Sequence, residues 1–468
     1  MNKQSNTNDY SNLFVGLDTL VPTLSGKMQR YINFDNAAST PALQAVEQSI
    51  VKFLKYYSSV HRGTGFKSQL STHFYEDARK TVLDFLGADD QEHTCIFGKN
   101  TTEAVNKLAH RFPYTDKRNI ILTTVMEHHS NDLPWRQVAR VIHADLTPEK
   151  KLDEKAFDKL LEKYGDQIAL VAITGASNVT GFLNPIHRIA EKAHKVGAQI
   201  FVDAAQLAPH RKINMLPLSD PKHLDYVAIS AHKMYAPFGT GALIGRKDTF
   251  EKGEPDLVGG GTIELVTLDK VTWSNPPDKE EAGSPNVLGA IALAASIHQL
   301  QRIGMDAVAA HEAELTSYIL ERLNKIDGIS VYGDTRPENA PNRLGVVPVN
   351  LRGISHFKVA AILGYEFGIG VRNGCFCAHP YLLNLLGFNE QEAEDVRERM
   401  RKGDRSDMPG LVRISFGLYN TTDEIDSLIT ALKAVLKGNY QGDYVQKIST
   451  GEYFPRNWQP DYSQYFSY

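Results

Sequence analysis

Residues 168–203 read IALVAITGASNVTGFLNPIHRIAEKAHKVGAQIFVD, and this stretch decides the fold class. It begins with an apolar, β-branched run at 168–174 and ends with a second such run at 199–203, and each has the composition of a buried strand. Between the runs, Asn184 suits the N-cap of a helix and Pro185 its first turn, after which apolar residues recur on one face until a glycine. The stretch therefore predicts a βαβ unit with two parallel strands.

The same alternation of strands and helices extends in both directions from this unit. Further apolar runs are expected to form strands at 93–97, 119–125, 226–230 and 241–245. Strands that alternate with helices are typical of a parallel sheet with helices on its faces. We therefore expect an α/β fold whose large domain spans residues 31–298.

The pattern changes near residue 300. A long amphipathic helix is expected at about 305–325, followed by mixed strands and helices, and we assign residues 1–30 and 299–437 to a smaller domain. The densely charged segment Arg397–Pro409 is expected to be a solvated loop. The tail, 438–468, carries six tyrosines, one tryptophan and two phenylalanines. Because so much aromatic surface is rarely left in water, docking on the body of the protein is favoured over a loose tail.

Composition and charge argue against several classes of partner. The chain of 468 residues is 42% apolar, and its 51 basic and 55 acidic side chains give a net charge of -4. This balance does not favour nucleic acid or an anionic membrane surface as a partner. The start of the chain is polar, and no apolar run reaches the roughly 18 residues of a membrane span, so a cytoplasmic location is expected. Three cysteines are too few for a disulfide framework, which agrees with a reducing compartment.

An acid and an amine follow two neighbouring strands of the predicted sheet. Asp203 comes directly after the run at 199–203, and Ser230-Ala231-His232-Lys233 follows the run at 226–230. Carboxyl ends of parallel strands form the usual ligand side of such a sheet. A desolvated amine there can form an imine with an aldehyde, and a buried acid can keep a pyridine nitrogen protonated. The pair therefore predicts bound pyridoxal 5'-phosphate (PLP).

A third strand runs through a glycine into the start of a helix at Phe97-Gly98-Lys99-Asn100-Thr101-Thr102-Glu103. Asn100 and Glu103 are spaced like a capping box. Free backbone N–H groups, hydroxyls and the positive end of the helix dipole suit a phosphate. By itself the motif also fits an ordinary capped helix, so the phosphate assignment depends on the acid and the amine.

The chain resembles the fold type I PLP enzymes of the class V aminotransferase family, and within it the group II cysteine desulfurases and selenocysteine lyases. The resemblance runs from Asn33-Phe34-Asp35-Asn36-Ala37-Ala38-Ser39 to Arg413-Ile414-Ser415, in order and over most of the chain. It implies a large domain with a mostly parallel, seven-stranded sheet covered by helices, plus a smaller α+β carboxyl-terminal domain.

The resemblance also implies roles for individual residues. Lys233 is expected to carry the cofactor as a Schiff base, and Asp203 to pair with the pyridine nitrogen. Further cofactor contacts are implied for Gln206 and Asn178 at the phenolic oxygen, for Thr101, Thr102, Ser230 and His232 at the phosphate, and for His128, which stacks on the ring and moves protons. Residues implied at the substrate are Arg413, which binds the carboxylate, together with Asn36, His61 and Arg62.

Two short motifs match segments that reach the partner's cofactor in dimers of this family. They are Gly259-Gly260-Gly261-Thr262 and Ala282-Gly283-Ser284-Pro285-Asn286. Ser284 stands where a phosphate-contacting hydroxyl is expected. A glycine run alone is usually just a turn, but the paired occurrence implies a homodimer.

The stretch Gly370–Pro380 places Cys377 where the family has its sulfur-accepting cysteine. A thiolate beside cationic groups gains a lowered pKa, as a nucleophile requires, whereas Cys95 lies inside a strand and is expected to pack. The chain departs from the group II pattern because Cys375 and Phe376 stand where histidines are usual, and this run is also similar to molybdenum-cofactor sulfurases. Relay of a persulfide, its resolution and simple packing all stay open for Cys375. Cys-x-Cys with His379 falls short of a closed metal site, and no metal is expected.

The resemblance implies that L-cysteine is converted to L-alanine and that the sulfur is left as a persulfide on Cys377. An acceptor thiol, for example on a sulfur-acceptor protein, then collects this sulfur. One alternative is a class V enzyme that acts on another amino acid as an aminotransferase, epimerase or carbon–sulfur lyase. A second alternative is a catalytically idle PLP-binding scaffold.

Overall fold

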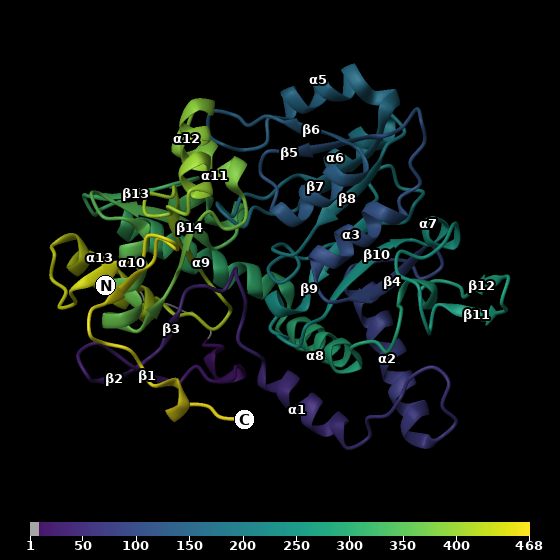
Figure 1. The fold of residues 1–468 in the computed structure, drawn as a ribbon, viewed down its shortest axis with the longest axis horizontal. Helices are drawn as coiled ribbons and strands as arrows, with labels where there is room; N and C mark the ends of the chain where they lie inside the picture. Colours follow the sequence, from purple (N-terminus) through teal and green to yellow (C-terminus); the bar gives the residue numbers. More distant parts are fainter. Residues whose placement is uncertain (1–8) are drawn as a thin grey trace. The chain divides into compact units, whose positions relative to one another are not determined.

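The computed structural model describes residues 9–468, and the chain separates into two compact units (Figure 1). The large unit consists of Ser39–Ser177 and Phe182–Ala309. Among the described residues, the small unit consists of 9–38, the short insertion Asn178–Gly181 and Ala310–Tyr468.

The large unit is built on a seven-stranded sheet whose strand order is β4-β10-β9-β8-β7-β5-β6. All neighbours are parallel except β10, which is antiparallel to β4 and to β9. The predicted mostly parallel, seven-stranded sheet is therefore confirmed. The strands are β4 (His93–Gly98), β5 (Ile120–Thr124), β6 (Arg140–Ala144), β7 (Ile168–Thr174), β8 (Gln199–Asp203), β9 (Tyr226–Ser230) and β10 (Gly241–Arg246).

Sequence reasoning found six of these strands and missed β6. This strand lies at the edge of the sheet, and most of its side chains are only partly buried. Its sequence, RVIHA, includes an arginine and a histidine and so lacks the continuous apolar run of β7, in which all side chains are buried.

Helices pack around this sheet. Helix α6 starts at Ile186 with Pro185 as its N-cap, so the prediction of Asn184 as the N-cap is wrong. The side chain of Asn184 instead donates to the carbonyl of Thr174, 2.9 Å away at the end of β7. The helices of this unit are α1 (Gln44–Leu54), α2 (Phe66–Phe85), α3 (Thr101–Arg111), α4 (Leu133–Val138), α5 (Glu154–Tyr164), α6 (Ile186–Lys195), α7 (Lys247–Glu251) and α8 (Val287–Ile303).

The small unit contains a four-stranded antiparallel sheet of order β13-β14-β17-β16, and β3 (Ile32–Asn33) pairs in parallel with β15 (Ile369–Gly370). Its core is apolar and includes Val347, Val349 and Ile414. The other elements are β1 (Leu20–Pro22), β2 (Met28–Arg30), β13 (Ile329–Val331), β14 (Val346–Leu351), β16 (Arg372–Gly374), β17 (Leu411–Ser415), α10 (His356–Phe367), α11 (His379–Leu386), α12 (Glu390–Arg401) and α13 (Thr422–Leu436). Helix α9 (Met305–Leu323) begins in the large unit, and its residues from Ala310 onward belong to the small unit.

The charged segment Arg397–Pro409 is not a loop throughout, because α12 continues to Arg401. A capping box formed by Asn389 and Glu392 starts this helix. Ion pairs three residues apart support its surface, including one of 2.8 Å between Arg401 and Glu398. The expectation of a loop was therefore wrong for the first part of the segment, where alternating charges stabilise a helix.

The aromatic tail docks on the small unit through a hairpin of β18 (Tyr444–Gln446) and β19 (Tyr453–Pro455). The hydroxyl of Tyr444 donates to Glu366, 2.9 Å away, and Trp458 packs edge-on against Tyr365. The last aromatic side chains are exposed, namely Tyr462, Tyr465, Phe466 and Tyr468.

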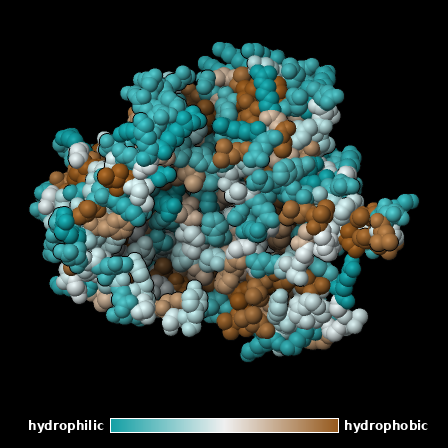
Figure 2. All heavy atoms as spheres, viewed as in Figure 1, coloured by the Kyte–Doolittle hydropathy of each residue, from teal (hydrophilic) through white to brown (hydrophobic). Residues whose placement is uncertain are grey.

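The face in Figure 2 is mostly hydrophilic, with apolar side chains gathered over the hairpin of β11 (Ile263–Val266) and β12 (Val271–Trp273). Leu265 and Leu268 in this hairpin are exposed. Within residues 9–468, no helix combines the length and the apolar composition that crossing a membrane would require.

Candidate active site

Asp203 is the last residue of β8, at the carboxyl edge of the parallel strands. Its side chain is buried and accepts a hydrogen bond of 2.9 Å from the N–H of Ala205. Burial raises the pKa of Asp203, and the positive charge of Lys233 acts in the opposite direction. A buried acid in this environment is stabilised by a cation.

Lys233 ends the short turn Ala231–Lys233 that directly follows β9, the neighbour of β8. The backbone of this turn is fixed, since the N–H and the hydroxyl of Thr40 both donate to the carbonyl of His232, at 2.9 and 3.0 Å. Burial and the charge of Lys233 lower the pKa of His232 to about 4, so that its ring is neutral at pH 7. The structure thus brings the predicted lysine and acid to the same edge of the sheet.

The amino terminus of α3 lies beside the end of β9. The N–H of Thr101 donates to the hydroxyl of Ser230 at 3.3 Å, and the hydroxyls of Thr102 and Ser130 are 2.7 Å apart. The hydroxyl oxygen of Thr101 is buried and has no hydrogen-bond partner. Three predicted phosphate residues therefore meet at a helix start, and one of them has unused hydrogen-bonding capacity.

His128 follows β5, and its Nδ1 atom accepts a hydrogen bond of 3.1 Å from the N–H of Ser130. The proton of the neutral ring is therefore on Nε2. The preceding residue, Glu127, was missed by sequence reasoning. It is buried and accepts hydrogen bonds of 2.6 Å from Thr124 and 2.7 Å from Asn131, yet burial raises its pKa to about 8. Only its position directly before His128 signalled it in the sequence.

The two predicted dimer motifs contact each other within the large unit. The N–H of Gly283 donates to the carbonyl of Gly260 at 2.7 Å. Ser284 lines a cavity of about 240 Å³ together with Gly98 and Lys99. Gln206, which was predicted at the phenolic oxygen of the cofactor, is buried in the large unit.

Three predicted substrate residues occupy different settings. His61 and Arg62 are exposed in the large unit, and the guanidinium of Arg62 donates to the carbonyl of Ile263 at 3.0 Å. Asn36 belongs to the small unit, where it is buried and its side-chain oxygen has no hydrogen-bond partner. A Cβ atom on Gly417 would lie 2.5 Å from that oxygen, so only glycine fits there without a shift.

Arg413, on β17 of the small unit, is only 3% exposed. Its Nη1 atom donates to the carbonyl of Asn178 at 3.1 Å, and its Nη2 atom to Asp35 at 3.0 Å. Its Nε atom is buried without a hydrogen-bond partner. The guanidinium carbon lies 4.8 Å from the centre of the Phe376 ring. Burial lowers the pKa of Arg413, and Asp35 opposes this. The arrangement suits capture of an anion.

The loop that carries Cys377 belongs to the same unit. Cys377 is exposed, whereas Cys375 is buried and its thiol donates to the carbonyl of Pro409, 3.0 Å away. Burial raises the pKa of Cys375 to about 12. Of the three roles left open for Cys375, these contacts favour packing. Burial also raises the pKa of Cys95 inside β4.

Near the amino ends of the parallel strands, opposite Asp203, the residues His194, His223 and Asp225 form a group that could bind a metal ion. The two rings are stacked, with centres 4.0 Å apart and an interplanar angle of 17°. The nitrogen lone pairs lie in the ring planes, and two stacked, nearly parallel planes do not meet at one nearby point where an ion could accept both. Arg246 also lies 3.2 Å from the same carboxylate. We therefore interpret the group as an ion-pair cluster.

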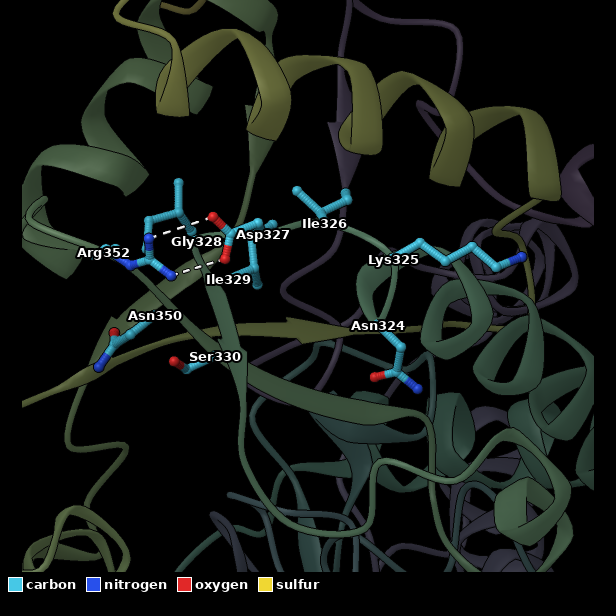
Figure 3. A pocket seen from close by; sticks show the side chains of 10 residues that line it. Asn324, Lys325, Ile326, Asp327, Gly328, Ile329, Ser330, Asn350 and Arg352 are labelled. Carbon is cyan, nitrogen blue, oxygen red and sulfur yellow. Dashed lines mark hydrogen bonds and ion pairs between the residues drawn. The ribbon is translucent and has the colours of Figure 1, made fainter.

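A pocket of about 560 Å³ lies in the small unit between 324–330 and 350–352 (Figure 3). The figure shows an ion pair across it, in which Arg352 and Asp327 are 2.8 Å apart. Both side chains are well exposed. None of the predicted site residues lines this pocket, so it adds nothing to the candidate site.

Comparisons with known proteins agree with this geometry. A model of the aminotransferase class-V family matches residues 32–428. A probable cysteine desulfurase of Halobacterium salinarum is 36% identical, and the match covers 86% of this chain and 90% of that protein. A second one, of Halalkalibacterium halodurans, is also 36% identical, with 92% and 97% covered.

Solved structures give the same result. The apo structure of a cysteine desulfurase from Thermococcus onnurineus NA1 has a TM-score of 0.75 and 35% identity, covering 87% of this chain and 95% of that one. The cysteine desulfurase CsdA of Escherichia coli, in an S-sulfonic acid form, has a TM-score of 0.72 and 28% identity, covering 87% and 95%. The chain therefore belongs to the aminotransferase class-V family.

Proposed function

We propose that this protein is a PLP-dependent cysteine desulfurase that converts L-cysteine to L-alanine and keeps the sulfur as a persulfide on Cys377. The observation that carries the proposal is in the small unit. An exposed thiol, Cys377, directly follows Phe376, whose ring packs on the buried guanidinium of Arg413. An anion-binding group and a nucleophile are thereby joined in one cluster, as an amino acid with a sulfur side chain requires.

The large unit fits the cofactor by the chemistry of its donor set. Asp203 would hold the pyridine nitrogen, and the unpartnered hydroxyl of Thr101, with Thr102, Ser230 and His232, would hold the phosphate. Gln206 of the large unit and Asn178 of the small unit are proposed at the phenolic oxygen. When bound through Lys233, PLP supplies an electron sink for the charge left at the substrate's Cα atom.

The side chains then have separate tasks. Arg413 binds the substrate carboxylate, assisted by Asn36, His61 and Arg62. The amine of Lys233 would be freed when the substrate's amine takes its place on PLP, and it would then remove the Cα proton. His128, whose Nδ1 atom accepts a hydrogen bond from the N–H of Ser130, moves protons beside the PLP ring. The Cys377 thiolate attacks the substrate sulfur, so that an S–S bond forms while the Cβ–S bond breaks. The electron pair of that bond stays on the carbon skeleton, which takes up protons and leaves as alanine.

The relatives named as cysteine desulfurases support this substrate. We also propose that the chain acts as a homodimer in which Ser284 reaches the partner's cofactor. The apolar side chains of Val51, Leu54 and Phe66 on α1 and α2 are exposed in the single chain. Exposed apolar groups of this kind support an interface with a second copy of the chain. An acceptor thiol, free or on a partner protein, must finally collect the sulfur.

Incubation of the PLP-loaded protein with L-cysteine tests the proposal. We expect alanine in the solution and one additional sulfur atom on the Cys377 peptide by mass spectrometry. Cys377→Ser should abolish both while the cofactor stays bound. The matched control is Cys95→Ala, which removes a thiol buried inside β4 and should leave both products in place. Alanine formation at the wild-type rate by Cys377→Ser would contradict the proposal.

A further inference from the structure

The residues Cys375 to Ala378 form a tight turn with an unusual backbone. The N–H of Ala378 donates to the carbonyl of Cys375 at 3.0 Å. The two central residues, Phe376 and Cys377, have φ angles of 53° and 54°. Turns with two successive positive φ angles are normally made by glycine, asparagine or aspartate. Neither central residue here is of that kind, so surrounding contacts must hold the backbone in this conformation.

Two of the contacts that support the turn involve Phe376. Its carbonyl accepts a hydrogen bond of 2.7 Å from the side-chain amide of Asn178. Its ring is buried against the guanidinium of Arg413, whose central carbon is 4.8 Å from the ring centre. Arg413 in turn donates to the carbonyl of Asn178. Phe376, Asn178 and Arg413 thus form a closed set of contacts, and the exposed Cys377 is the next residue along the chain.

Arg413 therefore belongs both to the proposed carboxylate site and to the contacts that hold this turn. Its Nη2 atom is shared with Asp35 at 3.0 Å, and its Nε atom is buried without a partner. A carboxylate that bound this guanidinium would compete with Asp35 and would shift the guanidinium plane. Because the Phe376 ring packs on that plane, the shift changes the support of the strained turn.

We propose that Phe376 is a positioning residue that couples carboxylate capture at Arg413 to the orientation and reactivity of Cys377. This inference rests on the proposed function and deepens it. The sulfur-accepting thiol is brought to its reactive orientation by the substrate's own carboxylate. Amino acids that fail to engage Arg413 leave the thiol in its resting orientation.

The test measures how fast iodoacetamide alkylates Cys377 in the PLP-loaded full-length protein, with and without L-alanine. L-alanine is used because it carries the carboxylate of the substrate but no sulfur. We expect L-alanine to change the rate about fivefold, the size of one partly desolvated cation–π contact. Phe376→Leu should reduce that ratio to one, and Phe376→Tyr, which keeps the ring, should restore it. A wild-type ratio of one, or an unchanged ratio in Phe376→Leu, would overturn the inference.

Two further variants exclude a purely structural effect. Phe454→Leu removes an exposed ring on β19 and should keep the wild-type ratio. If Phe376→Leu does not fold, as judged by thermal unfolding, Phe376→Met takes its place. Its alkylation rate should likewise be the same with and without L-alanine. A variant that is less stable but still shows the wild-type ratio contradicts the coupling, because a merely packed ring affects stability alone.

The outcome separates this inference from the proposed function. A persulfide on wild-type Cys377, together with an unchanged alkylation ratio in Phe376→Leu, would refute the coupling and leave the desulfurase in place. A ligand-dependent ratio that is lost in Phe376→Leu, without any persulfide from L-cysteine, would refute the desulfurase and leave the coupling in place.

Discussion

Asp203 and Asp225 are both buried at neighbouring strands of one sheet, yet their surroundings are opposite. Asp225 precedes β9 and accepts hydrogen bonds from His194 at 2.9 Å, His223 at 3.2 Å and Arg246 at 3.2 Å, and its pKa is lowered. Asp203 ends β8 at the other edge and has a raised pKa. Three side-chain donors thus surround Asp225, whereas the charge of Lys233 only partly offsets the burial of Asp203, which agrees with the proposed role of Asp203 at the pyridine nitrogen of PLP.

The largest effect is expected for Asp203→Asn. In the proposed mechanism Asp203 keeps the pyridine nitrogen protonated, so its loss should lower alanine formation from L-cysteine by about 10²–10³-fold. The unfolding free energy should stay the same or rise, because a buried acid with a raised pKa destabilises the folded state. Steady-state rates and urea unfolding measure both. If Asp203→Asn turned over L-cysteine at the wild-type rate, the functional distinction between Asp203 and Asp225 would be wrong.

The matched variant, Asp225→Asn, should show the reverse pattern. Removing one partner of a buried charge cluster costs about 3 kcal/mol of unfolding free energy. Activity per folded molecule should change little, since Asp225 lies at the other edge of the sheet. Thermal unfolding, with activity measured well below the transition, provides the check. A large loss of activity in a stable Asp225→Asn protein would contradict the comparison.

Glu127 offers a smaller effect that sharpens the picture of the functional edge. Burial raises its pKa from 4.5 to about 8. Between these values the unfolded chain releases a proton that the folded chain keeps, so this residue lowers stability progressively as the pH rises from about 4.5 to 8. Glu127→Gln should remove that part of the pH dependence. Unfolding free energies at several pH values test this, and parallel curves for the two proteins would refute it.

The smallest effect concerns the pH limits of the Asp225 cluster. The pKa of His223 is raised above 6.5 by Asp225, so its stabilisation is complete below that value and is lost as the pH rises through its folded pKa. The lowered pKa of Asp225 gives the opposite limit, since its stabilisation is present above 3.8 and is lost as the pH falls through its folded pKa. His223→Asn should flatten the alkaline side and, because His223 helps to lower the pKa of Asp225, should also weaken the acid limit. Urea titrations in a pH series would show it.

Much of the fold was predictable from the sequence because β7, β8 and β9 are buried, mostly apolar runs with sharp ends. The edge strand β6 and the charged end of α12 were not, since an exposed edge and a helix held by ion pairs leave no apolar run. Asp203 and Lys233 were predictable because residues after parallel strands share one edge. The contacts among Asp35, Phe376 and Arg413 join segments that are far apart in the sequence, and no local pattern announces them.

Borohydride reduction of the PLP-loaded protein, followed by peptide mass spectrometry, tests the central claim most directly. We predict one reduced pyridoxyl adduct, on Lys233, which persists in Asp225→Asn and is absent from Lys233→Ala. An adduct on a different lysine in the wild-type protein, or none after PLP is added, would contradict the account.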